Sequence, residues 1–348
     1  MIEKNTMLKY LNRPGFCVEN GIITQLNDAA AALLLTPGME VAPLLLTGSE
    51  ELQAFDRGCL YLKLNLAPGG LDAFVTDLDG QLLFLVDSAP DKDLQSLALA
   101  SRELRVPLSG MMVSASRMKD HGADTRDDFN RLTRSLHQTL RLVGNMSDAC
   151  RIPDPARQQM VNLTALFDEV FDKAQSAVAS AGLELTWQSL NKDVFSLADS
   201  DQLERAVLNI LSNAMKFTPK GGQIRASLTL NRQTLRLQIA DTGCGIPADV
   251  RETLFHRYQR QPGIEDSRFG LGLGMVIIRN AAACHGGTVL VDHPKEGGTR
   301  VTMTPQIRTP QAGSLRSPRV RMDYAGEWNH LLVELSDVLP PECFQKEL

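Results

Sequence analysis

The sequence lacks the patterns that mark several classes of protein. Its six cysteines are spread over 348 residues without a C-x-x-C pair, which argues against a zinc ribbon or a disulfide framework and fits a reducing cytosol. The most apolar stretch, residues 29–46, is interrupted by prolines, a glycine and a glutamate, so it cannot supply the roughly 20 apolar residues of a membrane-spanning helix. The N-terminus shows no signal peptide. We therefore expect a cytoplasmic protein.

An excess of basic charge is also missing. The net charge is −5 and aromatic residues make up only 5% of the chain, so a dedicated nucleic-acid binder is not expected. The apolar content of 43% with 22% charged residues excludes a disordered chain. A chain of this length has room for two or three globular domains.

Residues 1–90 consist of short apolar runs between turn signals. Asn20-Gly21 and Asp79-Gly80 each separate two such runs, as in tight β-hairpins, and residues 28–35 predict a short helix. The succession of strands, helix and strands predicts a small α+β module. Its layout resembles a PAS sensor domain, and an unrelated α+β domain without a ligand is the alternative.

Residues 91–152 change to a helical period and predict two antiparallel helices joined by a turn at Gly122. The two apolar seams are Leu97, Ser101, Leu104, Leu108, Met111, Ala115 and Met118, then Phe129, Leu132, Leu136, Leu140 and Val143. One hairpin leaves an apolar stripe uncovered, so two chains would close a dimeric four-helix bundle. The alternative is a hairpin that packs on the flanking domains of its own chain.

Residues 153–308 alternate helical and strand-like segments and predict an α/β sandwich. We expect its first helix to be capped by Thr164 and to stop at Gly182. Residues 309–348 read as a linker followed by an amphipathic helix. The apolar side chains of that helix are Trp328, Leu331, Leu332, Leu335 and Leu339. It would dock on its own core or, alternatively, on another protein.

The segment NILSNAMKF places Asn209 and Asn213 four residues apart on one helical face, with Lys216 one turn later. Amides beside an apolar surface need partners, and a metal-bound polyphosphate would satisfy them. Taken alone, such a pair is more often a feature of a helix surface.

Two glycine-rich segments follow. In IADTGCGIP an apolar strand runs into Asp241, whose carboxylate could accept a hydrogen bond from an exocyclic amine, while Gly243 and Gly245 allow a sharp turn. In RFGLGLGMVI, glycines at the entry to a helix would expose amide groups to phosphate. These are Gly270, Gly272 and Gly274.

In this order, and together with LFHRYQR, HGG and EGGTRVTM, the motifs resemble the N, G1, F, G2 and G3 boxes of sensor histidine kinases. The family's ATP-binding domain has the Bergerat fold, which type II topoisomerases and mismatch-repair ATPases share. The resemblance covers about 150 residues, or roughly 220 with the hairpin, far more than any single motif.

The resemblance implies ATP and Mg²⁺ as cofactors. Asn213 would hold Mg²⁺ with help from Asn209, and Lys216 would face phosphate. Asp241 would bind the adenine amine, and Thr299 would lie beside the adenine. The glycines would shape the pocket and close over the phosphates: Gly243, Gly245, Gly270, Gly272 and Gly274. The lid segment would contain Phe255, Arg257, Tyr258 and Arg260.

The hairpin departs from the family. SRELRVPL resembles the phosphoacceptor box SHELRTPL, but Arg102 replaces the histidine and Val106 replaces the threonine. A guanidinium group has no lone pair with which to attack a phosphoryl group. Glu103, the family's catalytic carboxylate, would have no histidine to activate. His121 and His137 lie several helical turns from this box and would be poor substitutes for the acceptor.

Whether the chain is an enzyme is therefore open. The first hypothesis is a dimeric histidine-kinase-family signalling protein, a pseudokinase that binds Mg-ATP, does not phosphorylate itself at the usual position, and pairs with a response regulator or a second histidine kinase. The alternative is an active protein histidine kinase in a two-component phosphorelay that uses another histidine or a partner's. A third hypothesis, ATP hydrolysis as in topoisomerases, is disfavoured because Asn209 occupies the position of their glutamate base.

Overall fold

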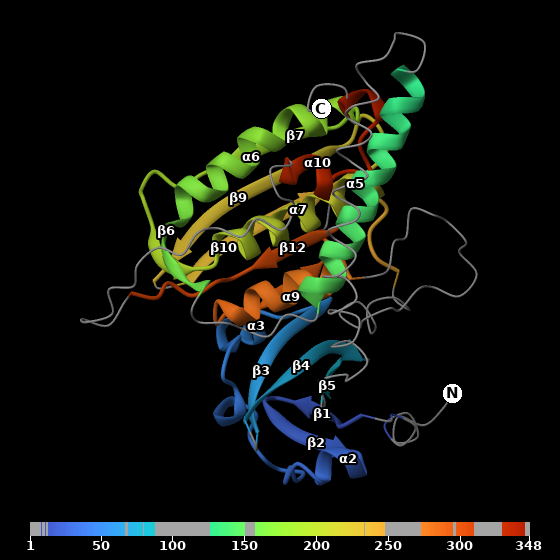
Figure 1. Ribbon diagram of the computed structural model, residues 1–348. Coiled ribbons are helices and arrows are strands. Elements are labelled where there is room, and N and C mark those ends of the chain that lie inside the picture. Colours follow the sequence, from blue (N-terminus) through green and yellow to red (C-terminus); the bar gives the residue numbers. More distant parts are fainter. Residues whose placement is uncertain are drawn as a thin grey trace.

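The computed structural model describes most of the N-terminal module and of the α/β sandwich, together with one helix of the hairpin and a C-terminal segment (Figure 1). The described residues are 8, 11, 13–66, 69–78, 80–87, 126–149, 157–232, 234–247, 273–294, 297–309 and 329–344. The first helix predicted for the hairpin, residues 97–118, lies outside these ranges. Within them, no helix combines the length and the hydropathy needed to cross a bilayer.

The N-terminal module is an antiparallel sheet in the order β2-β1-β5-β4-β3. The strands are β1 (Gly15–Glu19), β2 (Ile22–Leu26), β3 (Cys59–Leu66), β4 (Gly69–Leu78) and β5 (Gln81–Asp87), and the helical turns are α2 (Asp28–Ala31), η1 (Ala42–Leu44) and α3 (Ser49–Gln53). A core that includes Phe16, Leu62 and Phe84 joins one face of the sheet to these turns. The predicted α+β module is present.

Both predicted hairpins of this module are confirmed. β1 pairs with β2 across Asn20 and Gly21, which have φ angles of 54° and 80°, and β4 pairs with β5 across the second predicted turn. The helix expected over residues 28–35 is shorter than predicted. It ends at Ala31, because the chain then turns through Leu34, whose φ is 63°.

The second module is an α/β sandwich, as predicted. Its strands lie in the order β11-β12-β10-β9-β7, and a separate ladder joins β6 to β8. The elements are β6 (Gln159–Asn162), α6 (Leu163–Ser180), β7 (Glu184–Gln188), β8 (Phe195–Ala198), α7 (Ser200–Phe217), β9 (Gln223–Asn231), β10 (Thr234–Asp241), α9 (Gly274–Cys284), β11 (Val289–Asp292) and β12 (Arg300–Met303). Helices α6, α7 and α9 cover one face of the sheet (Figure 1).

The capping prediction for α6 is corrected by the structure. The side chain of Asn162 accepts the hydrogen bond from Ala165 N at the start of the helix, whereas Thr164 lies inside the helix and donates its hydroxyl to Lys192 O. Asn162 is the better cap because its backbone is extended there. The predicted stop at Gly182, with φ 78°, is confirmed.

The two modules share one sheet. β3 pairs antiparallel with β11, with Tyr61 opposite Val289 and Cys59 opposite Val291, so the described strands form a continuous ten-stranded sheet. Figure 1 shows β3 reaching the edge of the second module beside α9. Gly58 permits this approach, since a Cβ there would lie 2.1 Å from Val291 O.

Arg279 of α9 forms a second contact between the modules. Its guanidinium carbon lies 5.9 Å from the ring centroid of Tyr61 and 5.7 Å from that of Phe74, and its Nη1 is 3.8 Å from Asp87. The side chain is 5% exposed, so the aromatic faces and the carboxylate stabilise a largely desolvated cation. The helix that begins at the glycine-rich segment is thereby attached to the N-terminal sheet.

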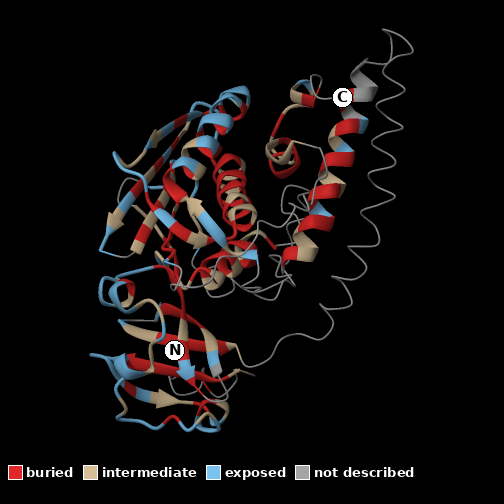
Figure 2. Cartoon of the chain, turned by 60° about the vertical axis from the view of Figure 1, so that its left-hand side comes forward, coloured by how far each residue is buried: buried red, intermediate tan, exposed pale blue. Residues whose placement is uncertain are grey.

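The C-terminal segment docks on its own chain. It consists of α10 (His330–Glu334) and η5 (Pro341–Phe344), both of which contact α5 (Arg126–Ala149), while α10 also contacts α7. Leu332, Leu335 and Leu339 are buried, as predicted for one side of this segment. Figure 2 shows buried residues along both α5 and the segment. Trp328 lies outside the described residues.

The predicted second helix of the hairpin is α5, but its buried face differs from the expected seam. Leu136, Leu140 and Val143 are buried, whereas Leu132 is 43% exposed. Polar side chains occupy the same buried face as the three apolar ones, because α5 faces the charged groups of α7 and the C-terminal segment. They are Asn130, Thr133, His137, Arg141 and Asp148.

We predict that Gly58→Ala weakens the junction of β3 and β11. The new Cβ would meet Val291 O, and φ is 114°, so the free energy of unfolding should fall by about 2–4 kcal/mol in urea denaturation. Gly21→Ala is the matched control, since φ there is 80° and nothing lies within 4 Å of the new Cβ. It should cost about 1 kcal/mol. Equal losses in both variants would contradict a tight junction.

Candidate functional site

Asp241 lies at the end of β10 with one carboxylate oxygen already engaged. Its Oδ1 accepts hydrogen bonds from Gly243 N at 2.8 Å and from Thr299 N at 3.2 Å. Among the described residues, nothing donates to Oδ2. Burial raises the pKa of Asp241, and the two backbone hydrogen bonds oppose that rise. The free oxygen is therefore available to accept a hydrogen bond from a ligand.

The backbone around Asp241 is closely packed. A Cβ on Gly298 would lie 1.8 Å from Asp241 O, and one on Gly243 would lie 2.5 Å from Phe217 O. Side chains at these two positions would push apart β10, the end of α7 and the start of β12. The glycines therefore let the carboxylate lie against bare backbone.

His293 closes the same region and was given no role by the sequence analysis. Its Nδ1 lies 2.8 Å from Gly298 O and its Nε2 2.9 Å from Ile246 O. The ring thus joins the loop after Asp241 to the loop before β12. A histidine six residues before Thr299 carries no sequence signal for this contact, which depends on the pairing of β11 with β12.

The paired amides of α7 face the start of α9. A Cβ on Gly274 would lie 3.3 Å from Asn209 Oδ1, 3.7 Å from Asn213 Nδ2 and 3.9 Å from Asn213 Oδ1. At the C-terminal end of α7, Phe217 O accepts a hydrogen bond from Cys244 N. The structure therefore brings three of the predicted motifs together along α7.

Lys216 lies in the last turn of α7, with its ammonium group 5.9 Å from the ring centroid of Phe217. The other predicted phosphate-facing and transfer residues lie outside the described ranges. They are Arg102, Glu103, Phe255, Arg257, Tyr258, Arg260, Gly270 and Gly272.

A metal ion could be held through amide oxygens. Carboxamide oxygens are suitable ligands for Mg²⁺, which keeps several waters and binds substrate phosphates. Asn209 and Asn213 supply such oxygens beside Gly274. Within the described ranges, no cluster of three His, Cys, Asp or Glu side chains could hold a metal. The residues present therefore fit a magnesium ion that is bound together with a nucleotide.

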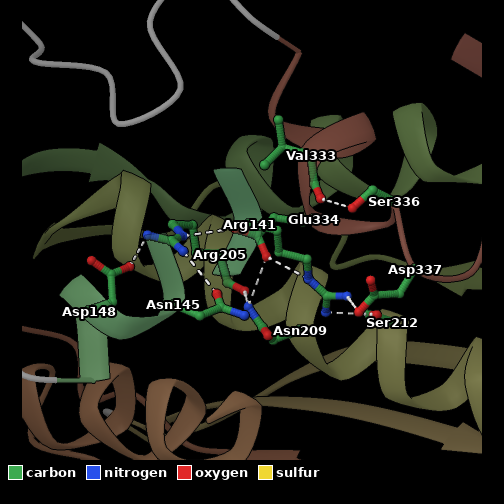
Figure 3. A network of polar contacts seen from close by, with 10 residues as sticks. All are labelled: Arg141, Asn145, Asp148, Arg205, Asn209, Ser212, Val333, Glu334, Ser336 and Asp337. Carbon is green, nitrogen blue, oxygen red and sulfur yellow. Dashed lines mark hydrogen bonds and ion pairs between the residues drawn. The ribbon is translucent and has the colours of Figure 1, made fainter. Parts of the chain in front are cut away.

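Next to these amides lies a buried network of charges that the sequence analysis missed (Figure 3). Glu334 of α10 is fully buried, with Oε1 3.0 Å from Arg205 Nε and Oε2 3.5 Å from Arg141 Nε. Arg205 also pairs with Asp148 of α5. Removing one partner from such a buried pair typically costs about 3–5 kcal/mol. The network therefore holds α5, α7 and α10 together.

The same network reaches the predicted site. Asn209 Nδ2 donates to Glu334 Oε2 at 3.2 Å and to Arg205 O at 2.9 Å. The only sign of this contact in the sequence is a charged residue within an amphipathic segment, since Glu334 lies between Leu332 and Leu335. Its partners are more than 120 residues away along the chain.

His137 is buried and packed. Its ring lies 5.1 Å from that of Phe344, edge to face, and Nδ1 lies 2.8 Å from Thr133 O. A phosphoryl group transferred to this ring would require the C-terminal segment to leave.

Comparison with known proteins agrees with this geometry. Residues 198–309 match the family described as "Histidine kinase-, DNA gyrase B-, and HSP90-like ATPase". The chain is 28% identical over 221 residues to hybrid signal transduction histidine kinase D of Dictyostelium discoideum, and 29% identical over 241 residues to histidine protein kinase DivJ of Caulobacter vibrioides. Residues 198–309 therefore carry an ATPase domain of this family, and about 60% of the chain is similar to sensor histidine kinases.

These matches cover part of each protein. They include 60% and 64% of this chain but only 14% and 39% of the two relatives. The crystal structure of full-length ShkA in complex with AMPPNP superposes with a TM-score of 0.51 and 26% identity, covering 63% of this chain and 47% of ShkA. The shared part is thus longer than the matched ATPase domain, residues 198–309, but it covers less than half of each of these proteins.

We predict that Asp241→Asn stabilises the protein near neutral pH when no nucleotide is bound. Because burial raises the pKa of Asp241, the folded state holds the proton more tightly than the unfolded state, so stability falls as pH rises through that raised pKa. The asparagine removes this loss and can still accept from Gly243 N and Thr299 N.

Thermal unfolding from about pH 4 to about pH 8 measures the effect. The melting temperature of Asp241→Asn should exceed that of the wild type at the upper end, and the difference should shrink toward the lower end. A difference that is constant or has the opposite sign would contradict the prediction.

Proposed function

We propose that this chain is a histidine-kinase-family signalling protein that binds Mg-ATP and does not phosphorylate itself at the usual position. The observation that carries the proposal is the Asp241 carboxylate, which keeps one oxygen free while backbone amides hold the other. An exocyclic amine, such as that of adenine, is the complementary donor.

The base of the nucleotide would lie against Asp241, Gly243, Gly245 and Thr299. The close backbone contacts of the glycines support this assignment, since a side chain at Gly243 would displace the end of α7. The contact of His293 with Gly298 O and Ile246 O would keep the two neighbouring loops at a fixed separation.

The phosphates would lie toward the start of α9, near Gly270, Gly272, Gly274 and Lys216. Asn209 and Asn213 would hold Mg²⁺, which neutralises phosphate charge when bound. The amide groups at a helix N-terminus add favourable partial charge. Their position beside both asparagines supports this assignment.

The acceptor box argues against self-phosphorylation. Arg102 has no lone pair for attack on a phosphoryl group, so Glu103 has no histidine to activate. Of the two substitutes that the sequence analysis considered, His137 is packed against Phe344. ATP would then act as a conformational ligand that changes how the ATPase domain packs on the hairpin.

The proposal has three further parts. They are dimerisation through residues 91–152, a PAS-like sensor role for residues 1–90, and pairing with a response regulator or a second histidine kinase. The succession of strands and helical turns in the N-terminal module supports the second point. Exposed Leu132 and Leu142 on α5 support the first, because burying these side chains against a second chain would stabilise a dimer.

Asp241→Asn should lower the affinity for Mg-ATP by about tenfold to a hundredfold, since a ligand amine would lose its charged acceptor. Calorimetric titration measures the change. Asp168→Asn is the matched control, because it removes the same charge from α6, where Asp168 accepts from Trp187 Nε1. An unchanged affinity in Asp241→Asn would overturn the adenine assignment.

The transfer step is tested with γ-labelled ATP. The wild type should acquire no acid-labile phosphate, and Arg102→His should acquire it if the ATPase domain can still reach the box. Labelling of the wild type would overturn the proposal and favour the active-kinase alternative, with His121→Ala identifying the acceptor. Transfer to an added hairpin domain that carries the usual histidine would favour the same alternative.

A further inference from the structure

We propose that Glu334, in the C-terminal segment, is a positioning residue of the nucleotide site: it fixes the carboxamide of Asn209 so that Oδ1 faces the metal. The inference rests on the proposed binding of Mg-ATP and adds to it a residue far outside the matched ATPase domain, which ends at residue 309. A segment of about 16 residues thereby becomes part of the site.

The hydrogen bonds of Asn209 determine which way its amide points. Nδ2 carries two protons, and both have acceptors, Arg205 O at 2.9 Å and Glu334 Oε2 at 3.2 Å. Oδ1 is therefore directed to the other side, where a Cβ on Gly274 would lie 3.3 Å away. Among the described residues, nothing donates to Oδ1, so it is available as a ligand.

Glu334 can impose this orientation because it only accepts hydrogen bonds. Its carboxylate is fully buried and held by Arg205 Nε at 3.0 Å and by Arg141 Nε at 3.5 Å. With the opposite orientation, Asn209 would direct a carbonyl oxygen at a carboxylate, and both would be acceptors. The buried setting makes such a mismatch costly. The amide is thus locked by a residue that itself cannot rotate freely.

Other contacts hold the C-terminal segment without touching Asn209. Arg134 Nε donates to Ser336 O at 3.0 Å, Gln138 Nε2 donates to the same oxygen at 3.3 Å, and Arg141 pairs with Asp337. The attachment of the segment therefore depends partly on side chains that do not touch Asn209. Changing one of these side chains weakens the attachment while the contact of Glu334 with Asn209 is kept.

Glu334→Gln is the informative variant. Glutamine has one oxygen and one amino group, and Arg205 takes the oxygen because its hydrogen bond is the shorter one. The amino group then faces Asn209, whose carboxamide must rotate and present Nδ2 to the metal. The variant preserves shape and most contacts, whereas Glu334→Ala would take a carboxylate partner from two buried guanidinium groups and destabilise the fold by about 3–5 kcal/mol.

Calorimetry measures ATP binding by the full chain in Mg²⁺ and in EDTA. Thermal unfolding reports the stability of each variant. Glu334→Gln should weaken ATP binding in Mg²⁺ about tenfold or more, as for changes to groups that orient metal ligands, and leave binding in EDTA unchanged. Asp337→Asn, the matched control, should lower the melting temperature without altering the Mg²⁺ dependence. Adding Asn209→Asp to Glu334→Gln should restore Mg²⁺-dependent binding, since a carboxylate offers an oxygen to both sides.

Equal Mg²⁺ dependence in Glu334→Gln and the wild type would overturn the positioning role. The same loss in Asp337→Asn would also overturn it, because attachment of the segment would then explain the effect. Failure of the wild type to bind ATP in Mg²⁺ would instead overturn the proposed function. The two failures are thus distinguishable.

Discussion

Arg205 imposes the constraint on which the packing around the site depends. The side chain lies in the middle of α7 and is 2% exposed, and a guanidinium group keeps its charge in any surroundings. Carboxylates from elsewhere in the chain must therefore approach it. Asp148 comes from α5 and Glu334 from α10. One buried cation thus explains why a helix of the hairpin and a C-terminal segment both pack on the ATPase domain.

A second constraint acts where the ATPase domain meets the N-terminal module. A sheet edge exposes unpaired backbone groups, and β3 covers the edge at β11. The ladder needs Gly58, where any side chain would collide with Val291 O. Arg279 adds a contact from α9 to Tyr61 and Phe74. A movement in the N-terminal sheet therefore has a direct mechanical connection to α9, whose first residue lies beside the paired asparagines.

These two constraints meet at α7 and α9, between which the phosphates of a nucleotide would lie. The N-terminal module contacts α9, the C-terminal segment contacts α7, and α5 contacts both helices. A ligand that changes the spacing of α7 and α9 would consequently change the contacts that these helices make with the rest of the chain. This arrangement suits a protein in which nucleotide binding alters domain packing, whether or not phosphoryl transfer follows.

Much of the fold was predictable because its determinants are local. Asn20-Gly21, the helical period of residues 200–217 and the glycines near Asp241 act within a few residues, so the hairpin, α7 and the sharp turn follow from the sequence. The family resemblance likewise depends on short motifs at the right spacing. The length of α2 and the cap of α6 were predicted less well, because Leu34 and Asn162 depend on how the chain continues.

The tertiary structure alone decided the long-range contacts. The pairing of β3 with β11 joins residues more than 200 positions apart, and Glu334 meets Asn209 across 125 positions. No local propensity encodes such partners: a buried carboxylate and a buried arginine satisfy each other only after the chain has folded. The sequence by itself determined the elements and the motifs of the ATPase domain. The folded chain determined which residues orient them, because desolvation penalties act only on groups that packing has removed from water.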